Sequence, residues 1–170
     1  MNRKDLEAVF SLNQWGVPFL SSPIPCENPK RLDPAELVLR LIQSSHPRLH
    51  LGVTAFFLVH SEKAPSVLQS LALLDQKSSL RLKYYYTAAA YLQRFWKSQL
   101  TFNPSLLPDY FSKEQGLPVP TALNARLGLL AIEEALQKEM NEPYNYLARF
   151  EALARLLQQQ GGLDATAGFS

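Results

Sequence analysis

Residues 33–59 read DPAELVLRLIQSSHPRLHLGVTAFFLV, and this stretch decides the fold class. It begins with Asp33 and Pro34, a typical N-cap followed by proline at the first helical position. Apolar residues then recur at helical spacing until residues 44–47 (SSHP) interrupt the pattern. The segment after this interruption is apolar on nearly every side, as in a buried helix. The stretch therefore predicts an amphipathic helix, a tight polar turn and a central buried helix.

A second pair of helices follows. A helix is predicted from Ala64, a turn at residues 76–79, and a long helix from about residue 80 to residue 98. When the sequence of the first pair is aligned on that of the second with an offset of 33 residues, Arg48-Leu49 falls on Arg81-Leu82. This match indicates that the two pairs are repeats of one unit.

An arginine early in the second helix, small residues at its middle and a tight turn before it resemble the HEAT family of α-helical repeats. The resemblance covers about residues 33–98 and implies right-handed antiparallel hairpins. The alternative is two unrelated hairpins that share only their periodicity. Because two repeats are too few for a stable solenoid, we expect the flanking segments to complete the core.

The flanks supply further helices around that centre. Residues 3–13 predict a short helix, and the proline-rich but apolar segment 14–32 predicts an arm laid across the helical body. Residues 121–160 predict a helical pair that ends at Gly161-Gly162, and residues 163–170 a flexible tail. In the first helix of this pair we expect seven apolar residues to face inward: Leu123, Leu127, Leu129, Leu130, Ile132, Leu136 and Met140. We thus predict an all-α fold, with about six helices in a single domain over residues 1–162.

Composition indicates a soluble cytoplasmic protein. The single cysteine, Cys26, has no partner for an internal disulfide, and the N-terminus lacks the apolar core of a signal sequence. The most apolar run, residues 51–59, is far shorter than the roughly 20 residues that span a membrane.

Motifs for catalysis and for cofactors are scarce. The three histidines have no cysteine or carboxylate at ligand spacing, and the seven glycines form no phosphate-binding loop. Five residues separate Arg40 from His46, which fits the loose Arg-x(4–6)-His spacing of the HEPN ribonuclease family. That spacing is common by chance, and here it spans a helix end. We therefore expect no enzyme activity, no metal and no cofactor.

The charge distribution is uneven although the net charge is only +2. No acidic residue occurs between Asp75 and Asp109, and the five cations there are interleaved with aromatic residues such as Tyr84, Tyr91 and Trp96. Such interleaving is typical of surfaces that bind nucleic acid, but also of protein interfaces. The residues that we expect to contact a partner come from the arm and from this basic-aromatic helix: Trp15, Phe19, Arg81, Lys83, Tyr84, Tyr86, Arg94 and Lys97.

These features favour a non-enzymatic interaction module, an adaptor or regulatory partner that presents a helical face to another protein. The alternative is a nucleic-acid-binding protein, or a HEPN-like ribonuclease, that uses the helix at 80–98. Basic and acidic helices could also pair between copies in a homo-oligomer. The segment from Leu107 to Pro118 resembles small bacterial helical proteins that accompany nucleotidyltransferases, so a nucleotidyltransferase is a further expected partner.

Overall fold

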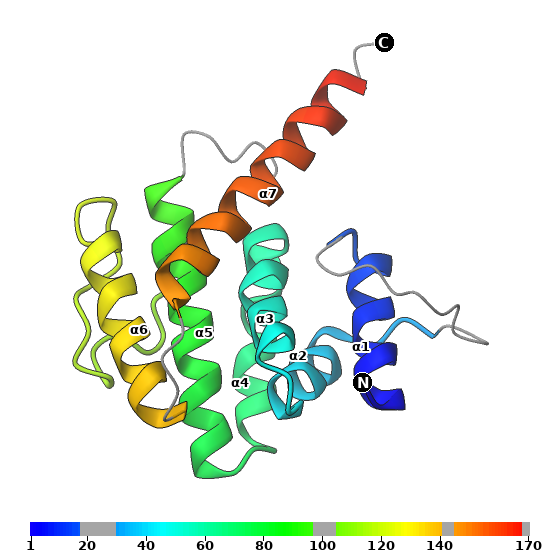
Figure 1. Ribbon diagram of the computed structural model, residues 1–170, viewed down its shortest axis with the longest axis horizontal. Coiled ribbons are helices and arrows are strands. Elements are labelled where there is room, and N and C mark those ends of the chain that lie inside the picture. Colours follow the sequence, from blue (N-terminus) through cyan, green and yellow to red (C-terminus); the bar gives the residue numbers. More distant parts are fainter. Residues whose placement is uncertain (18–29, 97–104, 141–144, 168–170) are drawn as a thin grey trace. The chain divides into compact units, whose positions relative to one another are not determined.

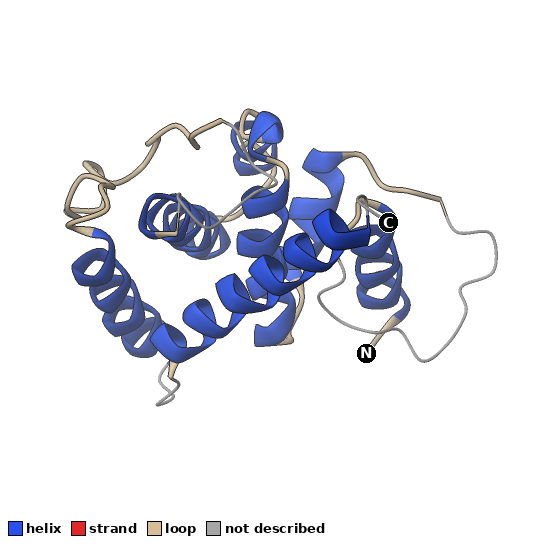
Figure 2. Ribbon diagram, turned by 90° about the horizontal axis from the view of Figure 1, so that it is seen from above, coloured by secondary structure: helices blue, strands red, loops and turns tan. Residues whose placement is uncertain are grey.

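The structure is a computed structural model that describes residues 1–17, 30–96, 105–140 and 145–167, and every regular element within these ranges is helical (Figures 1 and 2). The prediction of an all-α fold is confirmed. Two compact units, Met1–Tyr86 and Thr87–Ser170, divide the chain, and their boundary falls inside a helix. The elements are α1 (Arg3–Gln14), α2 (Pro34–Gln43), α3 (Pro47–Val59), the 3-10 turn η1 (Ser61–Lys63), α4 (Ser66–Leu71), α5 (Gln76–Phe95), α6 (Ala125–Met140) and α7 (Tyr146–Ala167).

Local capping fixes the first helices of the first unit where the sequence predicted them. Asn2 and Asp5 form a capping box at the start of α1. The backbone N–H of Glu36 donates to Asp33 Oδ1 at 3.0 Å, so Asp33 is the N-cap of α2 with Pro34 at the first helical position. These boundaries need no tertiary contact because side-chain oxygens satisfy the free N–H groups of each first turn.

The core of the first unit surrounds α3. Every residue from Leu49 to Leu58 is buried, which confirms the predicted central helix. Two hydroxyls tie helices together: Thr54 Oγ1 donates to the carbonyl oxygen of Tyr85 in α5, and Ser70 Oγ in α4 donates to that of Ala35 in α2, both at 2.8 Å. Each of these buried hydroxyls therefore has a hydrogen-bond acceptor on a neighbouring helix.

The predicted turn at residues 76–79 is wrong. These residues form the first turn of α5, because Asp75 acts as its N-cap and accepts from the backbone N–H of Ser78 at 2.7 Å. The chain reverses instead over residues 72–75, and α4 is only 6 residues long. The lysine and two serines after Asp75 looked like a turn in the sequence, but serine tolerates the first turn of a helix when a cap precedes it.

In the second unit, the connection after α5 is held on that helix by side chains of α5. Gln93 is buried, and its amide donates to the carbonyl oxygen of Ser105 at 2.7 Å and accepts from the backbone N–H of Leu107 at 2.6 Å. The hydroxyl of Tyr91 donates to the carbonyl oxygen of Pro118. The sequence of this connection predicts a single helical turn at Leu107–Lys113, whereas the structure has a bend and turns over residues 111–116.

α6 packs on α5 at very short range. A Cβ atom on Gly128 would lie 2.1 Å from Cζ of Tyr91, so only glycine allows the ring to lie against the backbone of α6. Leu129, Ile132 and Leu136 are buried with it, as predicted.

The prediction that Leu123, Leu127 and Leu130 face inward is wrong, because their exposed fractions are 96%, 63% and 43%. Met140 was also predicted inward, but its side chain lies outside the described residues.

α7 begins at Tyr146, where Asn145 Oδ1 accepts from the backbone N–H of Ala148 at 3.2 Å. Pro143, where the sequence predicts that this last helix begins, lies outside the described ranges. α7 does not end at Gly161-Gly162 as predicted but continues to Ala167. Glycine within a helix costs about 1 kcal/mol relative to alanine, which disfavours the helix without forbidding it.

Candidate partner-binding surface

The outer face of α6 exposes an apolar stripe. Leu127 and Leu130 lie three residues apart on α6 and share one side of the helix, and Leu123 is exposed in the turn two residues before the helix begins. We call these three residues the leucine stripe. Val119, four residues before Leu123, is also 62% exposed. Exposed apolar side chains that share one helix side mark a surface suited to contact with another apolar surface.

The packing of α6 explains why these leucines face outward. Ala125, Gly128, Leu129, Ile132 and Leu136 lie on the opposite side of the helix and are all buried. Gly128 lets the backbone of α6 approach the ring of Tyr91, so the helix rests on this face. In the sequence, Ala125 and Gly128 indicate which side of α6 faces the core, because close packing of two helices requires small residues on the touching faces.

Charged side chains border the leucine stripe. Arg126 is exposed at one flank, and Glu134 and Lys138 continue the line of the stripe toward the C-terminal end of α6. Arg126 also borders a small hollow together with Leu92, Phe95, Trp96, Leu129 and Glu151. An apolar centre bordered by charge is the usual composition of a protein interface.

Trp15, predicted as a partner anchor, is occupied by its own chain. Its indole N–H donates to the carbonyl oxygen of Leu32 at 2.9 Å. The guanidinium of Arg31 lies 4.1 Å from the ring centroid, and the rings of Phe56 and His60 contact it edge to face. The cation and the two rings occupy the aromatic surface that a partner would use. Phe19, the other predicted anchor of the arm, lies outside the described residues.

The residues predicted on α5 are divided between core and surface. Tyr86 is fully buried, and its ring contacts that of Phe57 at 5.1 Å between centroids. Arg94 donates to the carbonyl oxygens of Ala90 and Leu107 at 3.2 and 2.9 Å, so it anchors the connection after α5. The remaining predicted residues that the structure describes are half-buried: Arg81, Lys83 and Tyr84. Lys97 lies outside the described residues.

The aromatic residues of α5 therefore form core more than surface. Tyr85, Tyr86 and Tyr91 have no exposed surface, whereas Phe95 near the end of the helix is 46% exposed. Stacking on nucleic-acid bases needs exposed ring faces beside cations. α5 supplies few such faces, although Lys77 is exposed at its start.

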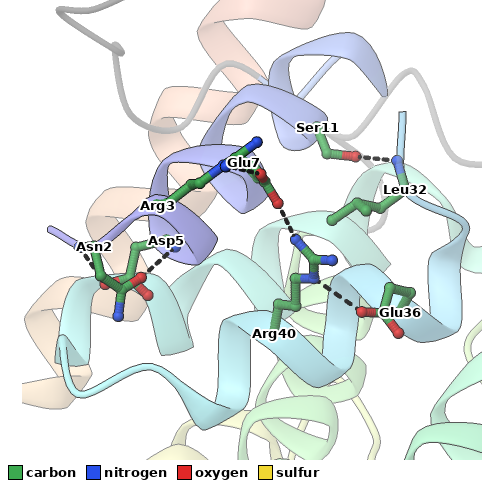
Figure 3. Close-up of polar contacts among 8 residues, drawn as sticks. All are labelled: Asn2, Arg3, Asp5, Glu7, Ser11, Leu32, Glu36 and Arg40. Atoms are coloured by element: carbon green, nitrogen blue, oxygen red, sulfur yellow. Dashed lines mark hydrogen bonds and ion pairs between the residues drawn. The ribbon is translucent and has the colours of Figure 1, made fainter. Parts of the chain in front are cut away.

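A polar cleft of about 420 Å³ lies between the start of α1 and α2. Arg40 lies at its edge and donates from Nε to Glu36 at 2.9 Å and from Nη1 to Glu7 (Figure 3). The hydrogen bond with Arg40 lowers the pKa of Glu7 from its usual value. The residues that line the cleft are Asn2, Lys4, Asp5, Glu36, Leu39, Arg40, Gln43, Ser44 and Ser45.

Arg40 and His46, the residues with ribonuclease-like spacing, contact different carboxylates. Arg40 bridges α1 and α2 through Glu7 and Glu36, and His46 Nε2 lies 3.7 Å from Asp5. Both contacts connect α1 to the helices that follow. Within the ranges that the structure describes, no three metal-ligating side chains are grouped.

His50 is a buried titratable group in the first unit. Its Nε2–H donates to the carbonyl oxygen of Ser44 at 2.8 Å, and its ring lies against that of Tyr85. Nδ1 has no hydrogen-bond partner among the described residues. Burial lowers the pKa of His50 to about 4, and the positive charge of Arg81 acts in the same direction. The imidazole is therefore neutral near pH 7, with its proton on Nε2.

No protein-family model, no curated protein and no solved structure matches this chain. The HEAT-like repeat and the resemblance of residues 107–118 to companions of nucleotidyltransferases therefore stay predictions. Among the described helices, none is long and apolar enough to cross a membrane.

Proposed function

We propose that this chain is a protein-interaction module and that it binds its partner through the outer face of α6. The observation that carries the proposal is the leucine stripe, three exposed leucines in and just before the first two turns of α6, a helix whose other side is packed into the core. Such a surface gains free energy when a partner removes it from water, at about 25 cal/mol per Å². The partner that fits is another helix with an apolar face and charged borders.

This surface differs from the one that the sequence favoured. Of the predicted partner residues that the structure describes, Trp15 and Arg94 contact their own chain and Tyr86 is buried. The three leucines of the stripe, in contrast, are 96%, 63% and 43% exposed. The function of an interaction module is retained, and α6 replaces α5 and the arm as the proposed site.

A capture experiment with matched variants tests the proposal. Leu127→Glu places a charge in the stripe, and Leu73→Glu makes the same change at a 70% exposed leucine in the turn before α5. Both variants should keep the helical content of the wild type, because surface substitutions shift stability by only about 0.5 kcal/mol. We expect a stoichiometric protein that is retained by the wild type and by Leu73→Glu, and lost from Leu127→Glu. Equal retention by all three proteins would contradict the proposal.

The same preparation tests nucleic-acid binding by α5. Retention of RNA or DNA that falls steeply between low and moderate salt, and that is lost in Lys77→Glu with Lys83→Glu, would favour that function over ours. We expect no such retention, because the tyrosine rings beside these cations are mostly buried.

A further inference from the structure

We propose that the first two turns of α5 bind a phosphate group through Arg81 and Lys77. The site uses none of the residues of the leucine stripe, so it goes beyond the proposed function. Lys77, Arg81 and Tyr85 follow one another at spacings of four residues and therefore lie along one side of α5. Their exposure falls along this row, because Lys77 is exposed, Arg81 is half-buried and Tyr85 is buried. The row thus brings two positive charges from the surface toward the core.

Arg81 is the centre of the site, because its guanidinium is partly enclosed by the fold. Its Nε is buried and has no hydrogen-bond acceptor among the described residues. His50, which is buried in α3, lies on the inner side of Arg81. The ring of His50 contacts that of Tyr85 at 5.7 Å between centroids, and the charge of Arg81 acts on it. A cation that is partly withdrawn from water is stable only when negative charge lies close to it.

The neighbouring chain supplies little of that negative charge. α5 has no acidic residue from Gln76 to Phe95. Asp75 precedes it, but the carboxylate is the N-cap of the helix and accepts from the backbone N–H of Ser78. That hydrogen bond is the main cause that lowers the pKa of Asp75, and the charge of Arg81 has a smaller effect. The N-terminus of α5 is itself partly positive, so charge and position both favour an anionic ligand.

The two cations favour phosphate over a carboxylate. A phosphate group carries up to two negative charges and has three oxygens, so it can accept from Lys77 and Arg81 together. A carboxylate carries a single charge and matches only one of the two side chains. Inorganic phosphate and phosphate esters offer the same group, and the inorganic ion is therefore a suitable probe. Because two side chains form the site, we expect a dissociation constant of about 5 mM.

Urea unfolding of the full chain at pH 7, with phosphate replacing sodium chloride at constant ionic strength, tests this inference. At about 50 mM phosphate the folding equilibrium constant of the wild type should rise about tenfold, because only the folded chain has the site. Arg48→Gln is the matched control, since Arg48 is exposed in the first turn of α3, and it should show the same rise. The rise should fall to about fourfold in Lys77→Gln and below about twofold in Arg81→Gln.

The control variant separates this site from a general effect of phosphate on stability. An equal rise in all four proteins, or no rise in the wild type, would overturn the inference. Lys77 is exposed, so Lys77→Gln keeps the test decisive if Arg81→Gln is poorly folded. Acetate at the same ionic strength should give a rise below about twofold, and a rise equal to that with phosphate would overturn the choice of phosphate.

A nucleic acid offers phosphate groups as well, and a retention assay distinguishes it from a small ligand. RNA or DNA that the wild type retains and Arg81→Gln loses would assign the site to a polymer and overturn the inference. None of these outcomes depends on the leucine stripe. The proposed function is tested separately by Leu127→Glu, so the failure of either proposal can be recognised by itself.

Discussion

Acid should destabilise this protein through His50. Its pKa is lowered from 6.5 to about 4 in the folded state, so below pH 6.5 the unfolded chain binds a proton that the folded chain does not. The stability that this group contributes is complete above pH 6.5 and is lost as the pH falls toward 4. Each pKa unit corresponds to 1.36 kcal/mol, so we expect His50 to lower the free energy of unfolding by about 2 kcal/mol between pH 7 and pH 5.

Urea unfolding at the two pH values, for the wild type and for His50→Gln, measures this effect. Glutamine keeps a donor near the carbonyl oxygen of Ser44 but does not titrate, while His46 and His60 titrate in both proteins. We expect the wild type to lose about 2 kcal/mol more than His50→Gln between pH 7 and pH 5. Equal losses in the two proteins would show that His50 is accessible to protons in the folded state, and would refute the reasoning.

Three further changes should lower stability in urea unfolding. Gly128→Ala should cost about 1–3 kcal/mol, because the new Cβ overlaps the ring of Tyr91; a gain of about 1 kcal/mol from helix propensity alone would contradict the packing. Gln93→Leu should cost about 2–3 kcal/mol and speed proteolysis after α5, since it removes two hydrogen bonds to the connection, and Gln69→Leu on the surface of α4 is the matched control. Asp33→Ala should cost about 1 kcal/mol, whereas Asp33→Asn should cost little, because asparagine also caps a helix.

The sequence predicted those parts of the fold that depend on neighbouring residues. The start of α2 depends on Asp33 and Pro34, and the burial of α3 follows from its apolar composition. The start of α5 was missed although it too is local, because Asp75 is an N-cap of the same kind as Asp33. There the apolar periodicity begins only at Leu80, four residues after the helix does, so periodicity alone places the start of α5 too late.

Contacts between distant residues could not be predicted in this way. Arg94 donates to the carbonyl oxygen of Leu107, 13 residues further along the chain. The cations of Arg31 and Lys63 both lie over the ring of Trp15. Both residues looked like partner anchors because arginine and tryptophan are enriched in interfaces. Their partners inside the fold became visible only with the tertiary structure.

The leucine stripe shows what a sequence pattern leaves open. α6 carries leucines on two opposite sides, and periodicity alone cannot choose which side faces the core. Gly128 decides the orientation, because the close approach of Tyr91 is possible on its side only. The core thus has glycine where it is tightest, and Leu127 and Leu130 on the other side of the helix face solvent. A helix that served only its own unit would place charged residues on that outer side, as α6 itself does at Glu134 and Lys138. The change from leucine to charge along one side of one helix is the pattern expected where an interface ends.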